Sequence, residues 1–327
     1  MLLSQYLKYQ TERNLYLGQN FSRHLVQKNI TPEEVISIHK VALEEIQELG
    51  ITDNIIISLD FLTEFMIQYG LALREHKILV EQQESMNHEI ELAAKVQNTM
   101  LRTKKPELDG VEIDFLSVPA GKMNGDYVYF QDDDSDFVGV GVADVVGKGI
   151  PAALCMSMVK NGLDTLGQAS ISPAYALDVL NRIVEKSVED NMFISMFYGR
   201  YDSEESIFTY ASAGHEPALY YCAREQKFYD LDESKGLLLG ILPDVHYTES
   251  SIKLEANDMI IIMTDGVTEC RTEDERFLTR EELIEMIFNV KEETPGDLAR
   301  SVFKALEKFQ AFHQRDDFTL AVIKKVQ

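Results

Sequence analysis

Hydrophobic positions in the first third of the chain recur every three or four residues, which is the period of an α-helix. Leu59, Leu62 and Phe65 follow this spacing within residues 53–80. An earlier helix start is marked by Thr31 as a cap and Pro32 in the first turn, followed by two glutamates. The pattern predicts an all-α helical bundle over residues 1–80, whose third helix covers residues 53–80.

Residues 81–101 contain no glycine or proline, and one set of positions alternates spacings of four and three: Met86, Ile90, Ala93, Gln97 and Met100. This spacing is typical of a coiled-coil seam. Two heptads also fit a single helix that lies on a neighbouring domain, and both interpretations stay open. In either case we expect residues 81–104 to form a linker helix that joins the bundle to a second domain.

After Gly110 the period changes to the alternation of β-strands. The expected strands cover residues 111–118, 127–131, 137–144, 193–201, 207–212, 218–222, 237–239, 247–254, 259–264 and 318–324. Helices are expected at residues 151–166, 173–188, 280–290 and 296–312. This order predicts an α+β fold for residues 105–327, a two-sheet sandwich flanked by helix pairs (αββα).

Two carboxylates lie at the ends of neighbouring predicted strands. Asp144 ends an apolar strand just before Gly147 and Gly149, and Asp126 precedes that strand on the other arm of a predicted hairpin. Adjacent carboxylates repel unless a cation lies between them. The pattern therefore indicates a divalent metal ion.

Two further acidic positions have the same setting. Asp265 follows the strand at residues 259–264, and the pair Asp316 and Asp317 precedes the last strand. Oxygen ligands select Mg²⁺ or Mn²⁺, and two such ions can activate water for attack on a phosphate ester. Asp144 and Asp265 could instead serve only as turn residues beside glycine.

Other candidate groups are less specific. Gly147 and Lys148 do not complete a nucleotide-binding loop, because that motif needs glycine at position 142 and serine or threonine at 149. Lys148 is a candidate for binding substrate phosphate, or a solvated loop lysine. His215, in a tight turn after a strand, either contacts the substrate as an acid or base or holds the turn together.

Composition limits the partners. Acidic residues outnumber basic ones by 55 to 31, a net charge of −24, which argues against binding to nucleic acid or an anionic membrane. The three cysteines match no metal-binding spacing and indicate a reducing, cytoplasmic compartment. No run approaches the roughly 18 to 20 apolar residues of a membrane span, so no membrane is expected.

Five motifs together resemble one family, the metal-dependent protein phosphatases of the type 2C superfamily in their sporulation-protein-E-like bacterial class. The resemblance covers roughly residues 105–326. The motifs are Gly125-Asp126-Tyr127, Ala143-Asp144-Val145-Val146-Gly147-Lys148-Gly149-Ile150-Pro151-Ala152, Ser212-Ala213-Gly214-His215-Glu216-Pro217, Thr264-Asp265-Gly266-Val267-Thr268-Glu269 and Asp316-Asp317-Phe318-Thr319.

The resemblance implies that Asp126, Asp144 and Asp265 bind two Mn²⁺ or Mg²⁺ ions, with help from the Val145 carbonyl. It favours Asp316 over Asp317 as the fourth acid, although both remain candidates. Two positions depart from the family pattern. Asn124 stands where many relatives have a second glycine, and Tyr129 stands where some have an aspartate.

Residues 36–40, 58–62 and 93–97 resemble phosphatases that regulate the general-stress sigma factor B. This implies a phosphoserine substrate on an anti-anti-sigma protein, and an activating switch kinase homologue bound to the N-terminal domain. We also expect a homodimer through the bundle or the linker. The alternative is a non-catalytic adaptor that uses a phosphatase-like fold as a binding module.

Overall fold

The computed structural model of the chain describes residues 2–48, 55–132, 135–147, 149–187 and 192–326. The chain divides into two compact units, Met1–Glu89 and Ile90–Gln327. The boundary falls inside one long helix, and the three-part division predicted from the sequence stays a prediction. Each unit is described by itself below.

The N-terminal unit is helical, as the sequence predicts. Its helices are α1 (Leu2–Lys8), α2 (Glu12–Gln27), α3 (Pro32–Glu48) and the first part of α4 (Ile55–Met100). Phe61, Phe65 and Tyr69 of α4 are among the residues that form its core.

The predicted start of α3 is confirmed. The Thr31 backbone N–H donates to Glu34 Oε2 at 2.8 Å, and the Glu34 N–H donates to Thr31 Oγ1 at 3.3 Å. This reciprocal pair satisfies two N–H groups that the first turn of a helix leaves without partners.

Helix α4 runs from Ile55 to Met100 without a break, so the predicted third helix and the predicted linker helix are one element. Its last turns belong to the second unit, and there Ile90, Ala93 and Ala94 pack against Met123 and Ala153. For these residues the structure matches the interpretation of a helix that lies on a domain, because their apolar side chains are covered by that unit.

The sequence analysis expected no segment long and apolar enough for a membrane span, and α4 contradicts this expectation. The helix contains an 18-residue window with a mean hydropathy of 1.4, long and apolar enough by composition to cross a membrane. Only 22% of this window is buried. A single helix of this kind is weak evidence for a membrane span. Phe61 and Phe65 of the same helix lie in the core of the helical bundle.

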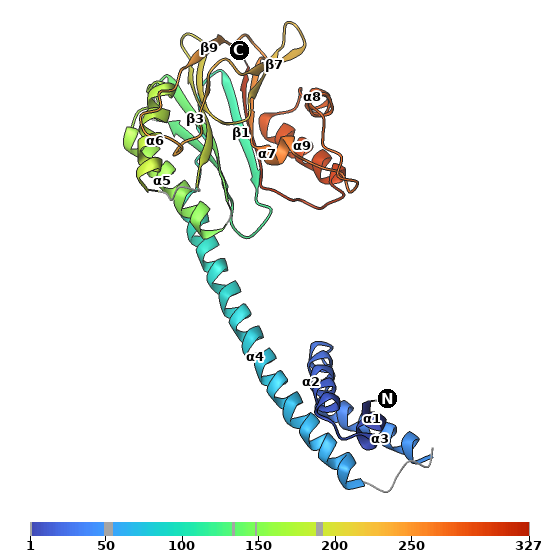
Figure 1. The fold of residues 1–327 in the computed structure, drawn as a ribbon. Helices are drawn as coiled ribbons and strands as arrows, with labels where there is room; N and C mark the ends of the chain where they lie inside the picture. Colours follow the sequence, from blue (N-terminus) through green and yellow to red (C-terminus); the bar gives the residue numbers. More distant parts are fainter. Residues whose placement is uncertain (1, 49–54, 133–134, 148, 188–191, 327) are drawn as a thin grey trace. The chain divides into compact units, whose positions relative to one another are not determined.

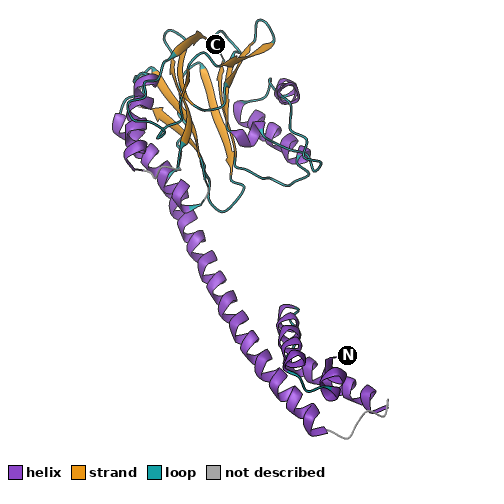
Figure 2. Cartoon of the chain, viewed as in Figure 1, coloured by secondary structure: helices purple, strands orange, loops and turns teal. Residues whose placement is uncertain are grey.

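The second unit contains two sheets that face each other, with helices on both outer sides (Figure 2). One sheet has the strand order β1-β11-β10-β6-β7. The other has the order β2-β3-β4-β5-β8, with β9 also paired to β5. The strands are β1 (Val111–Val118), β2 (Asp126–Asp132), β3 (Phe137–Val145), β4 (Ile194–Asp202), β5 (Ile207–Ala213), β6 (Ala218–Cys222), β7 (Lys227–Leu231), β8 (Lys235–Gly236), β9 (Ser250–Lys253), β10 (Met259–Met263) and β11 (Phe318–Lys325).

Three apolar layers hold this unit together. Val140, Val142, Phe197 and Ile260 belong to the layer between the sheets. The helices α5 (Ile150–Leu166) and α6 (Pro173–Ser187) pack on the sheet that contains β3, while α7 (Asp265–Thr268), α8 (Arg280–Asn289) and α9 (Pro295–Phe309) pack on the other sheet (Figure 1). Full burial of one large aliphatic side chain contributes roughly 1.5 to 3 kcal/mol. The predicted αββα sandwich is confirmed.

Differences from the predicted elements lie mainly at sheet edges. Strand β7 was not predicted, because it is an edge strand with three exposed side chains and no clear apolar alternation. The predicted strand at 237–239 is reduced to a single bridge between Leu239 and Ile194. The predicted strand at 247–254 is shortened to β9.

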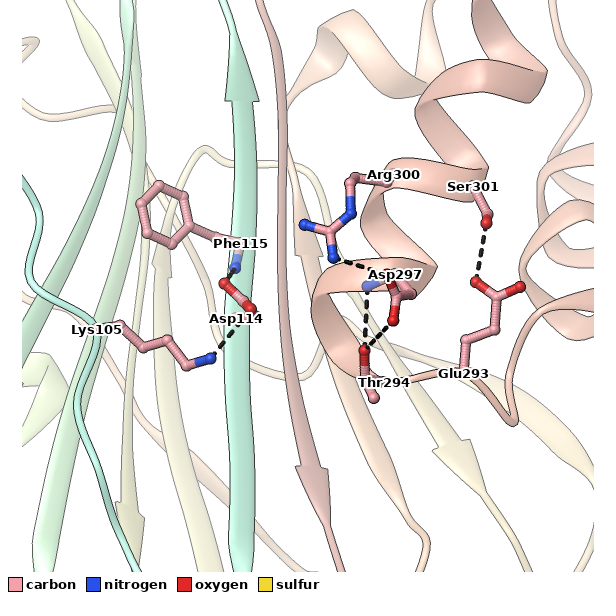
Figure 3. A network of polar contacts seen from close by, with 8 residues as sticks. All are labelled: Lys105, Asp114, Phe115, Glu293, Thr294, Asp297, Arg300 and Ser301. Atoms are coloured by element: carbon pink, nitrogen blue, oxygen red, sulfur yellow. Dashed lines mark hydrogen bonds and ion pairs between the residues drawn. The ribbon is translucent and has the colours of Figure 1, made fainter.

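Side-chain hydrogen bonds fix the start of α9 beside β1 (Figure 3). Thr294 Oγ1 accepts the Asp297 N–H at 3.3 Å and donates to the Asp297 carboxylate at 2.7 Å. On the neighbouring strand, Asp114 accepts from Lys105 Nζ at 3.1 Å. These contacts lie toward the end of β1 that is far from Asp126, so they stabilise the sandwich away from the predicted site.

Candidate metal centre

Asp126 and Asp144 are direct partners in the antiparallel pair of β2 and β3, as the sequence predicts. Such partners project from the same face of a sheet. Asp144 also shares a face with Val142 and Val140, which lie between the two sheets. Both carboxylates therefore point into one end of the sandwich, where Asp126 is only 3% exposed.

Asp265 comes from the opposite sheet, one residue after Thr264, at the start of α7. A Cβ atom on Gly266 would lie 1.8 Å from the Asp317 carbonyl oxygen. Only glycine permits this approach, which brings Asp265 next to the segment that carries Asp316.

Asp316 and Asp317 have different surroundings. Asp317 is buried, and its Oδ1 and Oδ2 accept the backbone N–H groups of Ala120 at 2.7 Å and Gly125 at 2.6 Å. Asp317 thus fastens the β1–β2 loop to the start of β11. Asp316 lies at the exposed rim and its Oδ1 accepts the Asp317 N–H at 3.0 Å. These contacts favour Asp316 as the ligand and Asp317 as a residue that organises the loop.

Burial and mutual repulsion disturb the titration of these acids. The pKa of Asp126 is raised well above its usual range, first by burial and then by Asp144. Burial, followed by the charges of Asp265 and Asp316, raises the pKa of Asp144 to about 7. The pKa of Asp265 is raised by burial and then by Asp316. Carboxylates that oppose one another's ionisation in this way would be relieved by a cation among them.

Oxygen atoms of separate segments meet at Gly125. A Cβ atom on Gly125 would lie 3.4 Å from Asp317 Oδ2, 3.6 Å from the Gly147 carbonyl oxygen and 3.7 Å from Asp144 Oδ1. Two carboxylate oxygens and one backbone carbonyl oxygen from distant segments therefore lie within van der Waals distance of this one position. An all-oxygen set of this kind fits Mg²⁺ or Mn²⁺.

The four acids lie near one another, but their carboxylate groups do not surround one common point. Within the described residues, no three His, Cys, Asp or Glu side chains form a ready-made metal cage. The donor chemistry fits a hard divalent ion, and side-chain movement would complete the ligand set.

Thr264 begins one of the five sequence motifs, but the sequence analysis gave it no role. Its Oγ1 donates to Asp126 Oδ2 at 2.7 Å, which fixes a buried carboxylate from one sheet to a strand end of the other. A threonine at a strand end has no distinctive spacing. Its place directly before Asp265 was the available signal.

His215 lies behind the site. It is 9% exposed, and its Nδ1 is 2.8 Å from the hydroxyl of Ser195, the cross-strand partner of Asp144. Burial lowers the pKa of the ring to about 4, and a hydrogen bond with the Met263 backbone opposes this shift. With this pKa His215 is neutral at physiological pH, and it contacts Ser195, the cross-strand partner of Asp144.

The predicted roles of Lys148 and of the Val145 carbonyl are not tested by the structure. Lys148 lies outside the described residues, so its contact with substrate phosphate stays a prediction. Val145 is the buried last residue of β3, directly after Asp144, and metal binding by its carbonyl also stays a prediction.

Another cavity cannot be the reaction site. It has a volume of about 860 Å³ and lies against the opposite end of β1 and β2, near Glu112, Asp114 and Asp132. None of the predicted site residues lines it.

Comparison with known proteins agrees with this geometry. Residues 134–326 match the family described as Stage II sporulation protein E (SpoIIE), and residues 1–72 match the N-terminal domain of phosphoserine phosphatase RsbU. The chain is 46% identical over 324 residues to phosphoserine phosphatase RsbU of Bacillus subtilis (strain 168), which covers 99% of this chain and 96% of that protein.

Solved structures show the same fold. The SiaA-PP2C domain of Pseudomonas aeruginosa superposes with a TM-score of 0.64 at 18% identity, covering 74% of this chain and 98% of that domain. The catalytic domain of the serine threonine protein phosphatase PstP, in complex with two manganese ions, superposes with a TM-score of 0.50 at 13% identity, covering 66% of this chain and 99% of that domain. The chain therefore belongs to the SpoIIE-type class of the PP2C phosphatases, which are metal-dependent, and is a phosphoserine phosphatase of the RsbU type.

Proposed function

We propose that the chain hydrolyses phosphoserine on an anti-anti-sigma protein, with two Mn²⁺ or Mg²⁺ ions held at one end of the sandwich. The ligands in this proposal are Asp126, Asp144, Asp265, Asp316 and the Val145 carbonyl, with Asp317 in support. The observation that carries the proposal is the approach of carboxylates from both sheets. Asp126 is the cross-strand partner of Asp144, and Asp265 and Asp316 lie close enough to raise the pKa of Asp144.

In this proposal, the residues around the site hold the metal ligands in position. Thr264 holds Asp126, and Asp317 holds the loop that carries Gly125. Divalent ions bound there would supply Lewis-acid activation of water and of the phosphoryl group. Lys148 is the candidate for binding the substrate phosphate.

The metal proposal has independent support from the relatives. PP2C structures include one described with two manganese ions. The all-oxygen donor set of this chain has the chemistry that manganese and magnesium accept. Two ions per site are therefore the proposed number.

We further propose that activity rises when a switch kinase homologue binds residues 1–80. The last turns of α4 contact the segment before Gly125 through an ion pair between Glu91 and Lys122 at 2.9 Å and through apolar packing of Ala94 on Met123. If α4 has two arrangements, a partner that binds one of them more tightly increases the population of that arrangement. Because α4 contacts the segment before Gly125, this shift would also change the position of the metal ligands. Release of phosphate from the substrate would then switch on a stress sigma factor.

The proposal includes a cytoplasmic homodimer. Cys155, Cys222 and Cys270 form no disulfide, which is the usual state of cysteines in the reducing cytoplasm. The strongly acidic composition argues against nucleic acid as a partner.

The experiment is dephosphorylation of a phosphoserine anti-anti-sigma protein, measured with and without Mn²⁺ and with and without the kinase homologue. We expect turnover that depends on Mn²⁺, stimulation by the partner, and loss of turnover in Asp144→Asn. Full activity of Asp144→Asn would refute the metal role. Unchanged activity with every partner would refute the activation.

The adaptor alternative predicts no turnover. All the acids expected from the resemblance are present and gathered at one end of the sheets, which favours the enzyme. Hydrolysis of a generic phosphate ester with Mn²⁺ separates the two functions, since an adaptor would bind without hydrolysis.

A further inference from the structure

Asn124 is a position where the sequence departs from the resemblance described above, which implies glycine there in many relatives. Its backbone does not explain the choice, because Asn124 is not among the described residues with positive φ. The explanation lies in its polar groups, four of which have partners. We infer that Asn124 is a positioning residue for Asp126, anchored by Gln97 at the end of α4.

The first contact acts directly on the segment of Asp126. Asn124 Oδ1 accepts the backbone N–H of Asp126 at 2.9 Å. A side-chain acceptor two residues before the donor replaces a backbone turn and fixes the chain direction. This hydrogen bond therefore sets the point at which β2 begins, and with it the base of the Asp126 side chain.

A second contact joins Asn124 to the opposite side of the sandwich. Its Nδ2 donates to Ser117 Oγ at 2.7 Å, and Ser117 Oγ accepts from Thr319 Oγ1 at 3.0 Å. Thr319 is on β11, two residues after Asp317. The loop before Asp126 is thereby tied to the strand that follows the acidic pair.

Gln97 provides the anchor. It is 4% exposed, its Nε2 donates to the Asn124 carbonyl at 2.6 Å, and its Oε1 accepts the Asn124 N–H at 3.2 Å. A buried amide that pairs with both backbone groups of one residue fixes that residue in position and in direction. Loss of Gln97 would leave two partly buried backbone groups without partners.

A cavity of about 200 Å³ lies beside this network, and Gln97, Ser117, Asn124 and Asp126 are among the residues that line it. Its presence means that the Asp126 segment is not held by close packing on this side. The hydrogen bonds of Asn124 therefore restrict that segment where van der Waals contacts do not.

The inference rests on the proposed function, because it concerns the readiness of Asp126 to bind a metal ion. Outer-sphere partners of metal ligands typically change metal affinity by about tenfold to a hundredfold when removed. We therefore expect Asn124→Gly and Gln97→Ala to weaken Mn²⁺ binding by about tenfold or more. Asn124→Ser keeps an acceptor for the Asp126 N–H and should weaken binding less.

The test is calorimetric titration of the full chain with Mn²⁺ in the absence of substrate. Activity as a function of Mn²⁺ concentration gives a second reading: both variants should need more Mn²⁺ and recover their turnover at saturation. Since the two residues act through one connection, the double variant should lose little more affinity than the weaker-binding single variant. Gln82→Ala, at an exposed position of the same helix, is the matched control and should bind as the wild type does.

The outcomes separate this inference from the proposed function. If the wild type binds no Mn²⁺, or if Asp126→Asn binds as well as the wild type, the metal role of Asp126 is wrong and the inference falls with it. If Asp126→Asn loses binding while folded Asn124→Gly and Gln97→Ala both bind normally, only the positioning role is wrong. Should Asn124→Gly fail to fold, Asn124→Ser and Gln97→Ala decide the question by the same titration.

Discussion

Replacement of Asp144 by asparagine should change stability in opposite directions with and without metal. In the metal-free protein the ionised Asp144 faces burial and the charges of Asp265 and Asp316, which raise its pKa from 3.8 to about 7. Asparagine is nearly isosteric and carries no charge. The substitution removes the repulsion, but it also removes the negative charge that a divalent ion needs.

The shift of about three pH units corresponds to at most about 4 kcal/mol of destabilisation above pH 7, since each unit is worth about 1.4 kcal/mol. Between pH 7 and pH 4 the folded protein retains a proton that the unfolded chain has lost. The stability contributed by this group therefore rises as the pH falls through that range. Asp144→Asn should raise the metal-free unfolding free energy at pH 8 and flatten this pH dependence.

The assay is denaturant unfolding at pH 8, once with a chelator and once with Mn²⁺. Saturating Mn²⁺ at a hundred times its dissociation constant would stabilise the wild type by about 2.7 kcal/mol, and the variant by much less. Asp109→Asn, at an exposed surface position, is the control and should change stability by less than about 0.5 kcal/mol in both conditions. The reasoning is refuted if Asp144→Asn destabilises the metal-free protein, or if Mn²⁺ stabilises it as much as the wild type.

Three further predictions follow from other parts of the molecule. Because the pKa of His215 is lowered to about 4, His215→Asn should leave the pH dependence of kcat between pH 6 and 9 unchanged, and loss of an ionisation from that profile would show an acid–base role. Gly266→Ala should destabilise the protein by more than about 3 kcal/mol, because its Cβ would overlap the Asp317 carbonyl, and a melting temperature equal to that of the wild type would contradict the packing. Light scattering at micromolar concentration should give twice the chain mass of 37.2 kDa, whereas a monomer mass would exclude the proposed homodimer.

The local pattern of the sequence was sufficient for the elements that rest on local chemistry. The Thr31 cap and the strands that end at Asp144 and before Asp265 were predicted because capping, alternation and glycine turns involve neighbouring residues. The pairing of Asp126 with Asp144 followed from a short hairpin. The order of strands and helices likewise led to the αββα sandwich.

Residues 53–101 show where local pattern was insufficient. The change in apolar spacing suggested two helices, but over the described residues 55–100 the structure contains one unbroken helix, α4. Spacing indicates which side chains share a face. It does not indicate what covers that face, and only the tertiary structure places Ala94 against Met123 and Ala153.

The sequence by itself was enough to pick out the candidate acids, to place them at strand ends and to name the class of metal ion that their oxygen atoms suit. Tertiary structure alone decided how each polar group is used: both oxygens of Asp317 accept backbone N–H groups, His215 lies buried behind Ser195, and Asn124 joins α4 to Asp126. The physical reason is that, apart from the bond between Asn124 and Asp126, these contacts join residues from 20 to almost 200 positions apart. Strand pairing and sheet packing bring such residues together, and no period along the chain records their distance in space.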